Sequence, residues 1–117
     1  MTERNREGMS TLEYHVLLAT ATAPLYGYAI KEAVEAESAG ALRPRAGSLY
    51  RVLARLMTAG LVAEAVPEGE VPPHPGRERK YYALTAAGRG ALADEARRLK
   101  DAAALAEERL GVARGRS

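Results

Sequence analysis

The sequence predicts a mainly helical α+β domain with three short helices, a two-stranded hairpin and a long last helix, in that order. Apolar residues recur at helical spacing in three segments between residues 10 and 59. A strand-like segment at 61–66, a loop at 67–76 with four prolines and a second strand-like segment at 77–84 form the hairpin. From residue 86 to residue 110 the helical periodicity continues without a proline.

Hydroxyl residues mark the start of the first and last helices. Ser10 and Glu13 have the spacing of a capping box, and Pro24 ends the first helix or opens the next turn. Thr85 caps the last helix, which we expect to reach Leu110.

Glycine and proline mark the limits of the second and third helices. The second helix runs from about residue 27 to residue 39, and Gly40 follows it as a C′ glycine. Pro44 and Gly47 shape the turn into the third helix, which ends at Gly60 in the same way.

Composition restricts the fold and the location of this 117-residue chain, which is long enough for one domain. Phe, Trp and Cys are absent, so the core consists of Leu, Val and Ala with some Tyr, and Tyr82 is the tyrosine that we expect inside. No apolar run approaches the roughly 20 residues of a membrane span. We expect a soluble, cytoplasmic protein without a cofactor or metal.

The third predicted helix and the turn before it are strongly basic. Four arginines lie between residues 43 and 55, and no acid occurs between residues 38 and 63. Arg51 and Arg55 are four residues apart and lie on a different face from the apolar stripe, which consists of Leu49, Val52, Leu53 and Leu56. A helix that buries one face and exposes uncompensated arginine on another suits a polyanion.

Two helices that lead into a basic third helix, followed by a hairpin, have the order of a winged helix-turn-helix domain. The helix fits the DNA major groove, and the basic hairpin reaches the backbone or the minor groove. We therefore expect double-stranded DNA as the partner, with the helix arginines on guanine edges or on phosphates. The expected contact residues are Lys31, Arg45, Ser48, Tyr50, Arg51, Arg55, Arg77, Arg79 and Lys80.

Several of these residues also have a structural interpretation. Ser48 contacts a phosphate or caps the third helix. Tyr50 contacts DNA or packs against the second helix, and Lys31 holds a phosphate or is an ordinary surface lysine. Residues 77–80 contact the backbone or form an edge strand protected by charge.

The last helix carries a second pattern, an a/d seam of leucine and alanine with spacings of 4, 3, 4, 3 and 4. The seam consists of Leu92, Ala96, Leu99, Ala103, Ala106 and Leu110. A helix of about 25 residues is about 37 Å long, which exceeds what a small three-helix domain covers. We expect a homodimer through this seam, and the alternative is a helix folded back on its own domain.

These patterns divide the chain into four parts. Residues 1–9 form a disordered tail and residues 10–85 the winged-helix DNA-binding domain. Residues 86–111 form the dimerisation helix, and residues 112–117 a second disordered tail.

Short motifs follow one another between residues 10 and 90. They are Leu-Glu-Tyr at 12–14, Val-Leu-Leu at 16–18, Pro-Leu-Tyr-Gly-Tyr-Ala-Ile at 24–30, Gly-Ser-Leu-Tyr-Arg-Val-Leu-Ala-Arg-Leu at 47–56, Gly-Leu at 60–61 and Arg-Lys-Tyr-Tyr-Ala-Leu-Thr-Ala-Ala-Gly at 79–88. In this order they resemble the PadR-like transcriptional regulators, in the short subfamily with a single C-terminal helix. The chain departs from the family at Arg45, Ala46 and Ser48, where a small polar residue, proline and threonine are usual.

The resemblance implies a bacterial repressor that binds a palindromic operator as a homodimer and is released by a small hydrophobic molecule. In some relatives flat molecules stack on aromatic residues between the paired C-terminal helices, whereas the last helix here has no aromatic residue. Leu99 and Ala103 could instead line a small apolar pocket with His15 and Val16. His15 hydrogen-bonds a ligand or responds to pH there, or it is an ordinary histidine.

Three rival interpretations remain. An enzyme fits poorly, because the chain has two histidines, no cysteine and no phosphate loop or metal-ligand cluster. The second rival keeps DNA binding without a ligand, as a constitutive repressor controlled by its level or by a partner. The third is a winged-helix protein-interaction or adaptor module without sequence-specific DNA binding. Salt separates it from a DNA-binding protein, because phosphate contacts release counterions and weaken steeply as salt rises.

Overall fold

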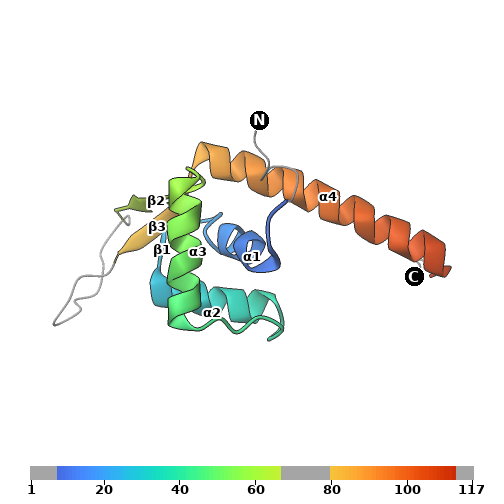
Figure 1. Cartoon of the computed structure of the whole chain (residues 1–117), viewed down its shortest axis with the longest axis horizontal. Coiled ribbons are helices and arrows are strands. Elements are labelled where there is room, and N and C mark those ends of the chain that lie inside the picture. Colours follow the sequence, from blue (N-terminus) through green and yellow to red (C-terminus); the bar gives the residue numbers. More distant parts are fainter. Residues whose placement is uncertain (1–7, 67–79, 113–117) are drawn as a thin grey trace.

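The computed structural model describes residues 8–66 and 80–112 of the chain. Three helices form a compact unit, a small sheet lies beside it, and a long fourth helix runs along the unit and extends beyond it (Figure 1). The elements in chain order are α1 (Thr11–Ala19), β1 (Leu25–Tyr26), α2 (Gly27–Glu37), α3 (Ala46–Thr58), β2 (Val62–Ala65), β3 (Tyr81–Leu84) and α4 (Ala86–Leu110). The predicted fold class, a winged helix-turn-helix domain followed by a long C-terminal helix, is confirmed.

Helix α1 begins with the predicted capping box. The Glu13 amide donates to the Ser10 hydroxyl at 3.1 Å, and the Ser10 amide donates to Glu13 Oε1 at 2.9 Å. The helix ends at Ala19, and the Thr20 hydroxyl then donates to the Val16 carbonyl oxygen at 3.0 Å. Pro24 therefore does not end the helix.

The glycines after α2 and α3 lie in the left-handed region. Gly60 has φ +81° and directly follows the C-cap residue Ala59, so it is the predicted C′ glycine. After α2 the C-cap is Ser38, so Ala39 occupies C′ with φ +55° and Gly40 follows with φ +82°. The second helix is therefore two residues shorter than expected, and its turn places an alanine in the conformation that we assigned to Gly40.

The sheet has three strands in the order β1-β3-β2. Strand β1, which sequence patterns did not predict, pairs with β3 through Leu25↔Tyr82 and Tyr26↔Tyr81. Strand β3 is central in this sheet, and Lys80, the one described residue of the segment 77–80 that could have been an edge strand, precedes β3 and is not part of a strand. Residues 77–79 lie outside the described residues.

One core joins the helices to the sheet. Its buried residues come from α1, α2, α3, β2 and β3, and they are Val16, Leu17, Ala19, Ile30, Val34, Leu49, Val52, Leu53, Leu56, Val62 and Tyr82. Tyr82 is 6% exposed, as predicted, and its aromatic ring supplies bulk that Leu and Val cannot.

The start of α4 is attached to the end of α3. The Thr85 hydroxyl accepts from the Gly88 amide at 2.9 Å, which is the predicted cap, and donates to the Gly60 carbonyl oxygen at 2.6 Å. A Cβ on Gly88 would overlap the Leu61 carbonyl oxygen, so this position requires glycine. Helix α4 begins beside the C-terminal end of α3, packs on α1 and continues past it to Leu110 (Figure 1).

Candidate nucleic-acid interface

Helix α3 separates an apolar face from a basic face. The four residues of its apolar stripe are at most 5% exposed, whereas Arg45 and Arg51 are exposed. Among the described residues neither arginine forms an ion pair, and Arg51 Nη2 donates only to the Ser48 hydroxyl at 3.4 Å. Both charges are therefore available to an anion.

The N-terminus of α3 is open. Its N-cap is Arg45, whose side chain makes no capping bond, and its first turn contains no acid. Ser48 is the third residue of the helix, so the interpretation of Ser48 as the N-cap is wrong. The N-terminus of α2 likewise has neither a side-chain cap nor an acid in its first turn. The amides of such first turns favour an anion, because they lack acceptors and carry the positive end of the helix dipole.

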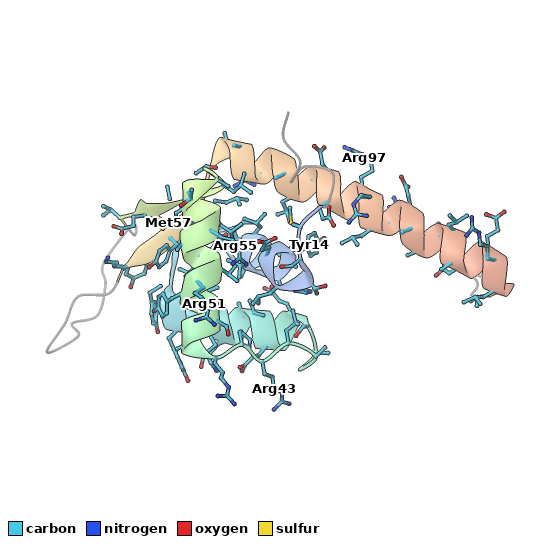
Figure 2. All side chains as sticks on the ribbon, viewed as in Figure 1. Tyr14, Arg43, Arg51, Arg55, Met57 and Arg97 are labelled. Carbon is cyan, nitrogen blue, oxygen red and sulfur yellow. The ribbon has the colours of Figure 1, made fainter. Side chains whose placement is uncertain are left out.

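Arg55 differs from Arg51, and here the expectation of uncompensated arginines is wrong. Arg55 Nε donates to Glu13 Oε2 of α1 at 3.2 Å. Glu13 lies 42 residues from Arg55 in the sequence. The sequence around α3 contains no acid, so it gave no indication of this ion pair. Figure 2 shows Arg55 one turn from Arg51, on the side of α3 that faces α1.

Two predicted lysines also have acidic partners. Lys31 Nζ donates to Glu35 Oε2 at 2.8 Å, one turn along α2, and this hydrogen bond raises the pKa of Lys31 above its usual value. Lys80 Nζ lies 3.6 Å from Glu64 Oε2, across the strand pair β2–β3. For Lys31 the structure favours the surface-lysine interpretation, because its charge is compensated locally.

Tyrosines border the basic face on the side of α2. Tyr50 is 49% exposed, and its hydroxyl lies where a Cβ of Gly27 would be, so it packs against α2 and faces solvent at the same time. Tyr28 at the start of α2 is 58% exposed and was not among the predicted contacts. It is the second residue of α2 and lies in the uncapped first turn of that helix. Arg77 and Arg79 lie outside the described residues.

One face of helix α4 is partly buried near the start of the helix and exposed further along. Leu92 and Ala96 are partly buried, and Leu92 packs against the domain's own core. Further along the same seam the residues are exposed, from Leu99 at 41% to Leu110 at 77%. Glu95 is 7% exposed beside the seam, and its carboxylate accepts from Arg98.

The four residues predicted to line a ligand pocket lie in different environments. Val16 is completely buried in the core, so it does not line an open pocket, and the prediction for Val16 is wrong for this structure. Leu99 and Ala103 lie on the exposed part of the seam. The His15 ring packs edge-on against Tyr14 with centroids 5.6 Å apart, and its buried Nδ1 has no hydrogen-bond partner among the described residues.

A family model and solved structures agree with this architecture. The model of the transcriptional regulator PadR-like family matches residues 16–94, which is more than half of the chain. The chain belongs to the PadR-like family of transcriptional regulators.

The solved structures show the same fold over most of this PadR-like protein. A PadR family transcription regulator from Clostridium difficile R20291 is 19% identical with a TM-score of 0.70, covering 86% of this chain and 99% of that one. Bacillus subtilis PadR, solved in complex with operator DNA, is 24% identical with a TM-score of 0.61, covering 73% of this chain and 47% of that one. The first has a similar length, which agrees with the short subfamily.

One curated relative matches the PadR-like region more closely in sequence. It is an uncharacterized 37.1 kDa protein in transposon TN4556 of Streptomyces fradiae, 43% identical over 81 residues. The match covers 69% of this chain but only 21% of the relative.

Membership of the PadR-like regulator family agrees with the expectation that the chain is not an enzyme. None of the helices in the described ranges is long and apolar enough to span a membrane.

Proposed function

We propose that this chain is a cytoplasmic repressor that binds a palindromic operator in duplex DNA as a homodimer. The observation that carries the proposal is the open basic face of α3, with Arg45, Arg51 and Ser48 beside an uncapped helix N-terminus. In this arrangement the first-turn amides and Arg51 hold phosphates, while the exposed face of the helix reaches base edges in the major groove.

The exposed half of α4 supports the homodimer. Leu99, Ala103, Ala106 and Leu110 continue the helix face that packs on α1 nearer the N-terminus, yet they face solvent in the single chain. A second copy that covers this face would relate two α3 helices by a two-fold axis. Their half-sites would then lie about one helical turn of DNA apart, or a multiple of it.

The proposal includes release of the operator by a small hydrophobic ligand at the α1–α4 junction. His15, with a buried nitrogen that lacks a partner among the described residues, supports a polar contact to such a ligand, and Leu99 and Ala103 offer apolar surface. The alanine-rich last helix offers no aromatic ring on which such a ligand could stack.

Fluorescence anisotropy with duplexes from the chain's own promoter, and with a random duplex, tests the function. Each phosphate contact contributes about −0.9 to the slope of log K against log salt, so several contacts give a steep salt dependence. A protein-interaction module would show no such dependence. Absence of binding to any duplex at low salt would refute the proposal.

A further inference from the structure

The Glu13 side chain connects the start of α1 to α3, because its two carboxylate oxygens accept from different partners. Oε1 accepts from the Ser10 amide at the start of α1, and Oε2 accepts from Arg55 Nε on α3. The Glu13 side chain is only 18% exposed, whereas that of Arg55 is 59% exposed. The acid is held inside and the guanidinium reaches outward.

The position of this carboxylate is stable for two independent reasons. It belongs to the capping box, and it lies in the first turn of α1, where the helix dipole favours a negative charge. The Lys80–Glu64 pair is looser, with a separation of 3.6 Å and both side chains more than half exposed. The charge of Arg55 is therefore compensated by a fixed group, and that of Arg51 is not.

A nearby acid changes which DNA group Arg55 favours. A phosphate that approaches Arg55 also approaches the Glu13 carboxylate. The two groups lie well within the Debye length of about 8–10 Å, so the phosphate meets a pair with almost no net charge and is attracted only weakly. Within the described ranges the terminal guanidinium nitrogens of Arg55 make no hydrogen bond, so a neutral acceptor on a base edge can still bind them.

We propose that Glu13 is a specificity-determining positioning residue, which withholds Arg55 from phosphates of arbitrary DNA and leaves its terminal nitrogens for an operator base. This inference rests on the proposed DNA-binding function. Its effect is to lower non-specific affinity, which widens the ratio of specific to non-specific binding.

The test is Glu13→Gln measured on a random duplex across a salt series. Glutamine is accepted in a capping box, so the start of α1 is retained while the charge is removed. Arg55 then neutralises one more phosphate for each protomer on the duplex. The slope of log K against log salt therefore becomes steeper by about 0.9. Between 50 and 200 mM salt, the affinity of Glu13→Gln relative to that of wild type falls by about 3.5-fold per protomer.

Four further variants separate this effect from a general effect of charge or of the helix cap. Glu108→Gln removes an equal charge from an exposed site on the far part of α4, and Ser10→Ala weakens the cap without a charge change. Both should leave the slope at its wild-type value. The double variant Glu13→Gln/Arg55→Ala should have the same slope as Arg55→Ala alone, because the steepening requires the Arg55 side chain.

The outcomes distinguish the two proposals. If wild type binds random DNA and Glu13→Gln has the slope of Glu108→Gln, the role of Glu13 is refuted and the DNA-binding function stands. If the steepening persists without Arg55, the role of Glu13 is refuted in the same way. If wild type binds no duplex at all, both proposals fall together.

Discussion

Arg51 offers the sharpest test of the interface. It is exposed on the outer face of α3, its only hydrogen bond within the described ranges is the 3.4 Å contact to Ser48, and no described acid compensates it. Its full charge is therefore available to the DNA that we propose as its partner. A charge-assisted hydrogen bond contributes about 1.5–3 kcal/mol, so Arg51→Ala should weaken operator binding at least about tenfold at low salt.

Arg97→Ala is the matched control, because it removes the same charge from a different part of the molecule. Arg97 lies on α4, well away from Arg51 (Figure 2), and pairs with Asp94 at 3.3 Å. In a salt series by fluorescence anisotropy, Arg51→Ala should flatten the slope by about 0.9 per protomer if it holds a phosphate, and Arg97→Ala should not. Equal losses in the two variants, or normal operator binding by Arg51→Ala, would refute the assignment of Arg51.

Three further predictions concern the dimer, the helix junction and the core. Leu99→Asp should raise the dimer dissociation constant at least about tenfold in sedimentation, whereas Leu105→Asp, at a site equally exposed but off the seam, should not; similar constants would count against the seam. Gly88→Ala should lower the free energy of unfolding by about 1–3 kcal/mol through overlap with a carbonyl oxygen. Gly90→Ala, which has open space around the new methyl group, should raise it by about 0.5–1 kcal/mol; denaturant melts in which both variants shift alike would contradict this. Burial raises the pKa of Tyr82, so the unfolded chain loses this proton first, and the stabilisation that the neutral phenol provides should disappear as pH rises above about 10. Ultraviolet titration should show one late phenol that is absent in Tyr82→Phe, and an unchanged titration would exclude this assignment.

Much of the fold could be predicted because its signals are local. The Ser10–Glu13 box, the Thr85 cap and Gly60 act within four residues of the backbone groups that they satisfy, so spacing alone predicts them. The apolar stripe of α3 was visible for the same reason. Strand β1 was not, because two residues carry no period, and its pairing partner β3 lies more than 50 residues away.

The sequence by itself determined the order of the elements, the basic character of α3 and the family, because these depend on residues close together along the chain. Only the tertiary structure decided which charges are free. Arg51 and Arg55 look equivalent in the sequence, but packing of α1 against α3 brings Glu13 to Arg55 and leaves Arg51 without an acid. The packing of α4 on the domain likewise divides its seam into a part that covers the core and a part that faces solvent, since burial depends on what lies opposite a helix face and periodicity does not contain that information.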